Sequence, residues 1–84
     1  MDTIYVIMKR IKLNGYDHYR FVVLNDDVCY TPFADEATTF FSAGSALFAA
    51  RELGLFGYEI AEGKNIDNDV TVWTVLMEVK EDVD

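Results

Sequence analysis

The clearest hydrophobic pattern in the chain is a helical one near its middle. The apolar residues between Ser42 and Gly54 recur at offsets of three and four: Ala43, Ala46, Leu47, Ala50 and Leu53. This spacing places them on one stripe of a 3.6-residue repeat. Ser42 is a suitable N-cap, because its hydroxyl can accept from a free amide of the first turn, and Gly54 suits a left-handed C-terminal ending. A helix of about 12 residues is marginal alone in water, so we expect a sheet to hold it.

The N-terminal segment, Ile4–Leu24, predicts a β-hairpin. Two runs rich in β-branched and aromatic residues flank Asn14-Gly15, which is the strongest short hairpin signal. A two-residue turn sets Lys9 opposite Arg20, and one face of the hairpin then carries a nearly continuous apolar set: Ile4, Val6, Met8, Tyr19, Phe21 and Val23. We expect this apolar face to pack against the helix, because like charges on the other face are better left in solvent.

The remaining segments predict two or three further strands. Val28–Thr31 forms a short strand that ends at Pro32, which cannot donate to a ladder. Tyr58–Ala61 and Val70–Val79 follow the helix, and residues 63–69 between them have the composition of a loop. Val70–Val79 is apolar on both faces, which indicates a central position in the sheet.

These elements predict a single small α+β domain over residues 1–84, in the order β-β-(β)-α-β-β. The expected architecture is a mostly antiparallel sheet of four or five strands with one α-helix packed on one face. Residues 80–84 are expected to form a flexible acidic tail.

The composition narrows the class of protein. A hydrophobic content of 51% and an aromatic content of 14% exclude a disordered segment, despite a net charge of −8. Cys29 is the single cysteine, which excludes an internal disulfide and fits a reducing compartment. The chain has no basic leader and no apolar run of about 20 residues, so we expect a cytoplasmic protein without a membrane segment.

The charge is unevenly distributed along the chain. Residues 1–25 hold four basic and two acidic side chains, whereas residues 26–84 hold three basic and thirteen acidic ones. An acidic surface repels nucleic-acid phosphates and attracts basic protein surfaces. We therefore expect a basic protein surface as partner and no direct contact with nucleic acid. Solubility alone is the competing explanation of this charge.

Motifs for catalysis or for cofactors are sparse. His18 and Cys29 are the single histidine and the single cysteine, and the hairpin register keeps them apart. Cys29 has the character of a small buried hydrophobe. Gly54-Leu-Phe-Gly57 lacks the lysine and helix of a phosphate-binding loop, and Asp67-Asn68-Asp69 lacks the ligand set of a calcium loop. We expect no catalytic residues, no metal and no cofactor.

Two groups of residues are candidates for partner binding. The hairpin tip carries Tyr16, His18 and Arg20, a mixture that interface hot spots favour, although these residues also suit an ordinary exposed turn. The second half contributes acidic residues that can occupy a nucleic-acid-binding groove in place of phosphates: Glu59, Glu62, Asp67 and Asp69.

The whole-chain pattern resembles that of small phage-encoded anti-CRISPR proteins. The shared features are a short acidic chain, an opening strand such as Tyr5-Val-Ile-Met-Lys-Arg10, an alanine-rich helix in the middle and a β-rich end. The resemblance carries over no functional residue. It implies a non-enzymatic inhibitor that binds a nucleic-acid-handling protein in the cytoplasm, the host's if the chain is phage-encoded. The alternative is a small homodimeric interaction domain with no target related to nucleic acid.

Overall fold

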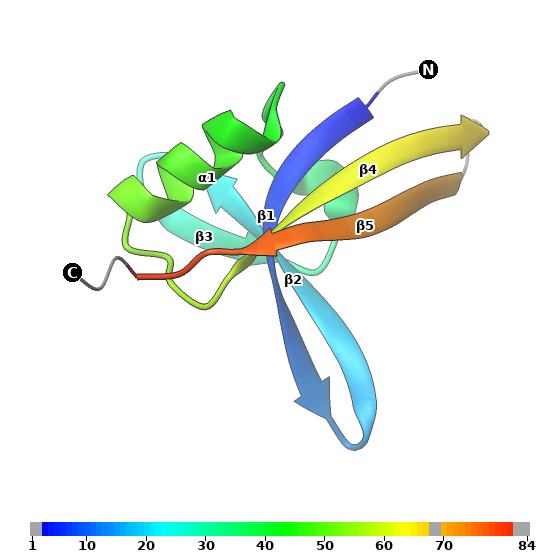
Figure 1. Ribbon diagram of the computed structural model, residues 1–84. Coiled ribbons are helices and arrows are strands. Elements are labelled where there is room, and N and C mark those ends of the chain that lie inside the picture. The colour runs from blue at the N-terminus through cyan, green and yellow to red at the C-terminus, as the bar shows by residue number, and fades with distance from the viewer. Residues whose placement is uncertain (1–2, 68–69, 82–84) are drawn as a thin grey trace.

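The chain forms a five-stranded antiparallel sheet and one α-helix, in the order that the sequence predicts (Figure 1). The computed structural model describes residues 3–67 and 70–81. The elements are β1 (Thr3–Leu13), β2 (Tyr16–Leu24), β3 (Val28–Thr31), the short 3-10 helix η1 (Ala34–Glu36), α1 (Ala43–Glu52), β4 (Glu59–Asp67) and β5 (Val70–Glu78). The predicted α+β class is confirmed, while part of the predicted tail, residues 82–84, lies outside the described residues.

The helix α1 begins and ends where its sequence signals lie. The Ser42 side chain accepts a hydrogen bond from the Ser45 amide at 3.1 Å, as an N-cap does. Gly54 has φ 69°, and the Leu55 amide donates to the Ala50 carbonyl at 2.9 Å. This left-handed ending turns the chain back toward the sheet and allows Leu55 to join the core.

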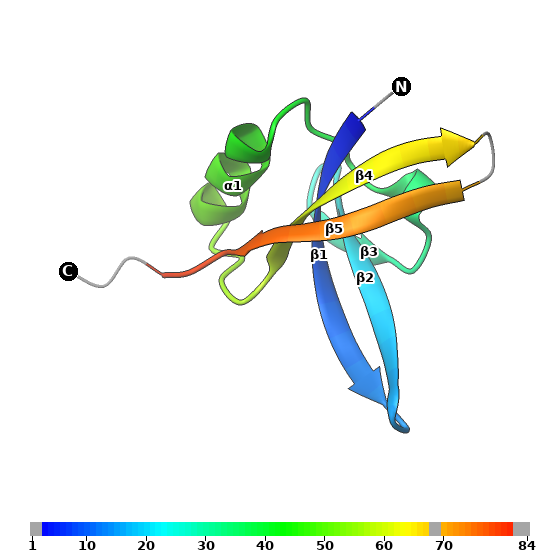
Figure 2. The same ribbon diagram turned by 45° about the vertical axis from the view of Figure 1, so that its right-hand side comes forward.

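The sheet has the strand order β3-β2-β1-β4-β5, and the predicted register of the first hairpin is confirmed, with Lys9 opposite Arg20. Inward of the Met8–Phe21 pair, β1 and β2 separate, and the segment before α1 passes between them. Tyr5 there exchanges two backbone hydrogen bonds with Phe40, at 3.1 and 2.8 Å. The outer part of the hairpin, residues 9–20, projects from the body of the molecule (Figures 1 and 2) and is called the hairpin arm below.

The two faces of the sheet carry separate apolar clusters. The cluster under α1 contains Ile7, Val22, Ala46, Ala50, Leu55, Ile60 and Val79, all buried. The cluster on the opposite face contains Val6, Met8, Phe21 and Ala61, and the segment around η1 covers it in part through Ala34 and Ala37. The expectation that the helix packs on the Val6–Met8–Phe21 face is therefore wrong. Lys9 and Arg20 do not exclude the helix from their own face, because they lie on the projecting arm beyond its reach.

The last two strands differ from their predictions in length and position. β4 extends through Asp67, so most of the predicted loop at residues 63–69 is strand. β5 is an edge strand and not a central one. A register shift between the Ile60–Met77 and Ala61–Val75 pairs sends Met77 toward the helix core and Val75 toward the opposite face. The bulge therefore lets Met77 join the helix-side cluster although Trp73 and Val75 lie on the opposite face.

The described part of the chain has no helix that is long and apolar enough to cross a membrane. The Cα radius of gyration is 12.8 Å, somewhat above the value of about 12 Å for a compact chain of this size, as the projecting hairpin arm leads one to expect.

Candidate protein-binding surfaces

The predicted residues of the first hairpin all lie on one face of the hairpin arm. Tyr16, His18 and Arg20 alternate along β2, and their side chains therefore point to the same side. Tyr16 is 73% exposed beside the turn, and His18 is exposed opposite Ile11. Arg20 is half-buried, nearer the body of the molecule. The arm thus presents a mixed aromatic and cationic strip that is open to a partner.

A pair of tyrosines lies where this strip meets the body. The Tyr58 hydroxyl donates to the Tyr30 hydroxyl at 2.8 Å, and the two rings stack with centroids 6.0 Å apart. The Lys9 Nζ lies 5.1 Å from the centroid of the Tyr58 ring. Partial burial, with the hydrogen bond to Tyr30, raises the pKa of Tyr58 to about 12. A hollow of about 240 Å³ adjoins these rings and is lined by Lys9, Ile11, Arg20, Tyr30 and Tyr58.

The predicted acidic residues of β4 are engaged within the molecule. Arg10 forms two hydrogen bonds with the Glu59 carboxylate, from Nε at 2.7 Å and from Nη2 at 2.9 Å. This contact raises the pKa of Arg10 above its ordinary value. Glu62 lies 3.4 Å from the Lys64 ammonium group. The two glutamate side chains are only 15% and 20% exposed, so each offers a partner less charge than its sequence position suggests.

The predicted residues do not converge on one surface. Asp67 is the last residue of β4, and Asp69 lies outside the described residues. Tyr16 pairs with Leu13 at the hairpin tip, whereas Glu62 pairs with Tyr5, eight positions back along β1. At about 3.4 Å per residue, the hairpin tip and Glu62 lie far apart along the sheet.

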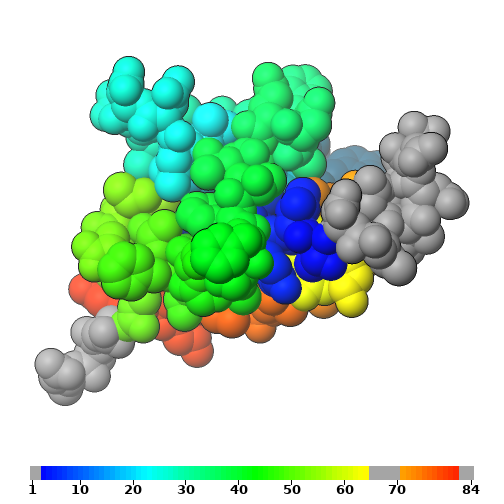
Figure 3. Space-filling view, turned by 90° about the horizontal axis from the view of Figure 1, so that it is seen from above, coloured from blue at the N-terminus to red at the C-terminus, as the bar shows by residue number. Residues whose placement is uncertain are grey.

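An acidic surface borders β3, at residues that the sequence does not mark as a candidate site. Asp26 and Asp27 precede this strand and Asp35 and Glu36 follow it, and all four are exposed. We call these four residues, with the exposed rings of Tyr30 and Phe33, the acidic edge. The segments before and after β3 stand out as two lobes on the same side of the molecule (Figure 3). Asn25-Asp26-Asp27 is recognisable in sequence as a turn, but only the fold shows that this turn and η1 flank the same edge strand.

The carboxylates of the acidic edge are available to a partner. Glu36 accepts a hydrogen bond from the Thr31 hydroxyl at 2.7 Å, which fixes η1 against the end of β3. Within residues 3–67 and 70–81, Asp26, Asp27 and Asp35 form no ion pair. Phe33 between these charges is 61% exposed. An aromatic ring framed by unpaired carboxylates suits a partner that is basic and partly apolar.

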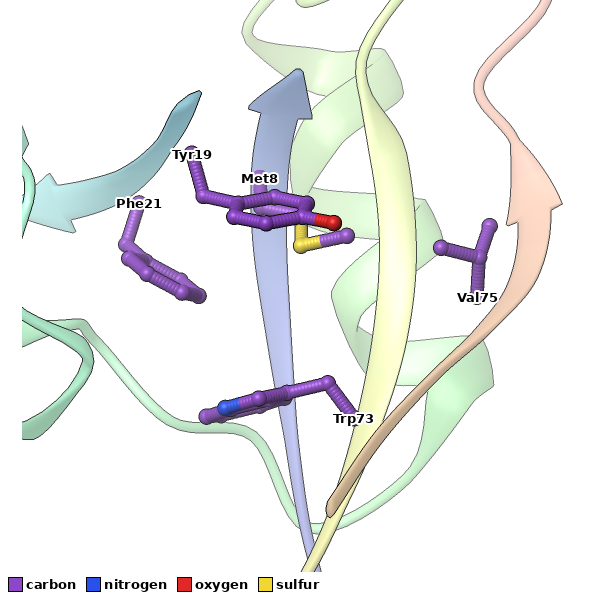
Figure 4. Close-up of a pocket in the computed structure, with 5 residues that line it drawn as sticks. All are labelled: Met8, Tyr19, Phe21, Trp73 and Val75. Carbon is purple, nitrogen blue, oxygen red and sulfur yellow. The ribbon is translucent and has the colours of Figure 1, made fainter. Parts of the chain in front are cut away.

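An apolar groove lies on the face opposite the helix. Met8, Tyr19, Phe21, Trp73 and Val75 line a cavity of about 140 Å³ (Figure 4), which we call the aromatic groove. The rings of Phe21 and Trp73 are 5.4 Å apart between centroids and tilted by 45°. Trp73 lies across Gly63, where an added Cβ would come within 2.7 Å of the indole ring. A tryptophan paired across from a glycine predicts such a groove. The sequence shows this pairing only once the β4–β5 register, which sets Gly63 opposite Trp73, is known.

The groups with catalytic potential are separate from one another. His18 lies on the hairpin arm, and Cys29 lies in β3 opposite Val23, five positions farther along β2. An odd spacing along a strand places these two positions on opposite faces of the sheet. Cys29 is exposed, contrary to the expectation that it is buried. The described residues include no group of three or more histidine, cysteine, aspartate or glutamate side chains that could hold a metal ion.

Comparison of this chain with protein-family models, with curated proteins and with solved structures finds no match.

Proposed function

We propose that the protein acts by binding and not by catalysis, and that its acidic edge docks on a basic surface of a protein that handles nucleic acid. Docking there blocks access of nucleic acid to that surface. The mode of action is that of a small anti-CRISPR-type inhibitor, in the cytoplasm, which is the host's if the chain is phage-encoded.

The observation that carries this proposal is the concentration of unpaired carboxylates around β3. Asp26 and Asp27 lie at one end of a four-residue strand and Asp35 at the other, with Phe33 exposed between them. A four-residue strand spans about 10 Å, so the charges are spaced over a length comparable to a few nucleotide phosphates. In the described part of the chain these three carboxylates form no ion pair, whereas Glu59 and Glu62 do.

The net charge supports association with a basic partner. At −8 on 84 residues, the molecule attracts positively charged surfaces over about 10 Å at ordinary ionic strength. Lys9 and Arg20 of the hairpin arm border the acidic edge at Tyr30, whereas the carboxylates that carry the attraction lie before and after β3. Attraction of this kind accelerates encounter and weakens as salt is added.

The chemistry of the chain favours binding over catalysis. His18 and Cys29 lie on opposite faces and are both exposed, so neither activates the other. The largest exposed features are instead aromatic rings and carboxylates, which are contact-forming groups.

A charge-reversal experiment tests the proposal. The immobilised protein is used to capture proteins from a host lysate at low and at high salt, and duplex DNA is then added as a competitor. The triple variant Asp26→Lys, Asp27→Lys, Asp35→Lys is compared with a control in which three exposed carboxylates elsewhere are reversed, namely Asp17→Lys, Glu52→Lys, Glu81→Lys. Both variants carry the same net charge.

We expect the wild type and the control to capture a nucleic-acid-binding protein that salt and DNA release, and the acidic-edge variant to lose it. Equal capture by the two variants would show that net charge alone, and not the acidic edge, governs binding. A captured protein that DNA does not displace would contradict the blocking of a nucleic-acid site.

The second candidate function, a homodimeric interaction domain, is favoured by a different feature, the open edge of β5.

A further inference from the structure

We infer that β5 is a self-association site, at which the strand pairs antiparallel with β5 of a second copy of this chain. The inference is independent of the proposed function, because it uses the edge of the sheet farthest from the acidic edge in the strand order. Pairing there joins the two five-stranded sheets into one.

The composition of β5 does not match its position. Val70–Met77 contains eight residues in a row without a charge and without a proline, which is the composition of a central strand. In the described structure β5 has β4 on one side and no strand on the other. Val72, Val75 and Leu76 are exposed along it. Long, apolar, unprotected edge strands are templates for pairing with another chain.

The opposite edge of the same sheet is protected. β3 has four residues, is followed directly by Pro32, and is bordered by Asp26 and Asp27 on one side and by η1 on the other. Short length, proline and flanking charge are the usual means by which proteins prevent edge pairing. The chain therefore uses these means on one edge and omits them from β5, which we interpret as selection for pairing at β5.

Charge favours a second copy as the occupant. Two molecules of net charge −8 repel one another wherever their carboxylates meet, and the uncharged stretch Val70–Met77 of β5 is the strip where they do not. The regular part of the β4–β5 ladder on the β5 side is Thr71–Val75, so we place the two-fold axis within it. An axis at Trp73 pairs Val70–Leu76 of the two copies, so each Glu78 lies outside the paired stretch and about 34 Å from the Glu78 of the other copy.

The pairing also extends the aromatic groove. Trp73 and Val75 line this groove from β5, and both lie within the paired stretch. A second copy places its own Trp73 and Val75 across the axis on the same face, because a two-fold axis perpendicular to a sheet keeps each face on its own side. The two grooves then lie next to one another and share an apolar surface that neither copy has alone.

Sedimentation equilibrium over a range of concentrations tests this inference. Thr74→Lys introduces a charge at the centre of the open edge, at a side chain that is already exposed. Thr39→Lys makes the same change at an exposed position outside the sheet strands and is the matched control. Circular dichroism confirms that both variants are folded.

We expect a wild-type dimer that Thr74→Lys weakens about tenfold or more and that Thr39→Lys leaves unchanged. Added salt should preserve or strengthen this dimer, since like charges repel across it, whereas salt should weaken the acidic-edge complex. The two proposals can therefore fail separately. A wild type that stays monomeric up to about 1 mM would overturn the inference, as would equal dimerisation of the two variants.

Hydrogen exchange gives a second, local measurement. Amides of Thr71–Val75 that do not bond to β4 should exchange more slowly as concentration rises, in parallel with dimer formation. If protection appears elsewhere on the surface, or appears on β5 only when a target protein is added, the occupant of the edge is not a second copy and the inference fails.

Discussion

The two faces of the sheet differ in how completely other elements cover them. The covered face contributes mainly to the stability of the fold, and the open face is available for binding. On one face, α1 closes over Ile7, Val22 and Ile60, which are almost completely shielded from solvent. On the other face, the η1 segment covers only part of the cluster of Val6, Met8, Phe21 and Ala61, and the aromatic groove, which Met8 and Phe21 also line, stays open. Among the described residues, the helix-side cluster has seven buried members and the opposite cluster has four, so the more completely covered face also holds the larger core.

This contrast shows how a chain of 84 residues divides its apolar side chains. A domain of this size buries a smaller share of its surface than a large one, and one helix is long enough to cover only part of one face. The apolar residues on the second face then become available as a contact surface. We therefore expect substitutions under α1 to change the free energy of unfolding, and substitutions in the groove to change association.

The largest effect is expected from truncation under the helix. Ile7→Ala removes a fully buried side chain from the centre of the helix-side cluster, and should lower the free energy of unfolding by about 2–5 kcal/mol. Tyr19→Ala on the groove face removes a larger side chain that is 43% exposed, and should cost about 1 kcal/mol or less.

Urea unfolding followed by circular dichroism measures both variants. If Ile7→Ala does not fold, Ile7→Val provides a milder test at about 0.5–1.5 kcal/mol. Equal losses for the Ile7 and Tyr19 variants would mean that the two faces contribute alike to stability, and the comparison would be wrong.

The next largest effect is expected at the glycine beneath the groove. Gly63→Ala places a Cβ within 2.7 Å of the Trp73 ring, which must then shift and alter its contact with Phe21. We expect a loss of about 1–3 kcal/mol and a shift in the emission of Trp73, the chain's single tryptophan. In the Trp73→Ala background the same substitution should cost much less, as a double-mutant cycle would show.

Gly44 offers a matched control on the other face. It lies in α1, and a Cβ there would meet only the Ser42 Oγ, at the unstrained distance of 4.0 Å, so Gly44→Ala should stabilise the protein by about 0.5–1 kcal/mol. If Gly63→Ala also stabilised the protein, the close approach of Trp73 to β4 would not be a constraint on the groove.

The local parts of this fold are predictable from sequence, because their signals act over a few residues. Asn14-Gly15 fixes the register of the first hairpin, and Ser42 and Gly54 fix the two ends of α1. The order of elements follows from these signals. These signals do not predict which face of the hairpin the helix covers. Both faces carry apolar side chains, and the position of the helix depends on where the arm leaves the body.

The candidate site is less predictable, because it depends on contacts between segments that are distant in the sequence. Glu59 is a free carboxylate in sequence but is paired with Arg10 in the fold, across 49 positions of chain. The apolar composition of β5 predicts a central strand with a neighbour on each side. The sequence does not show whether both neighbours belong to the same molecule. Asp26 and Asp35 come to flank one edge of the sheet only because β3 takes that edge.

A smaller effect is expected at the start of the helix. Ser42→Ala removes the side chain that caps the Ser45 amide, and should lower the free energy of unfolding by about 1 kcal/mol. Ser42→Asp should retain most of the stability, since a carboxylate also caps and favours the positive end of the helix. Thermal unfolding measures both variants, with Thr39→Ala, an exposed change just before the helix, as control. An unchanged melting temperature for Ser42→Ala would show that packing on the sheet alone defines where α1 begins.

The smallest effect concerns the tyrosine pair on the helix-side face, where the hairpin arm meets the body, and it appears only at alkaline pH. The pKa of Tyr58 is raised to about 12, first by its burial and then by the hydrogen bond to Tyr30, both of which favour the neutral phenol. The folded state is therefore favoured by this group below about pH 10, the ordinary pKa of tyrosine, and that contribution is lost as the pH rises from about 10 to 12. A titration that follows tyrosinate absorbance should show one of the five tyrosines ionising last, and Tyr58→Phe should remove that final step while Tyr16→Phe should not. If Tyr58→Phe leaves the last ionisation step in place, the Tyr30–Tyr58 pair is open to solvent. The covered region of the helix-side face then ends at α1 and does not reach Tyr58.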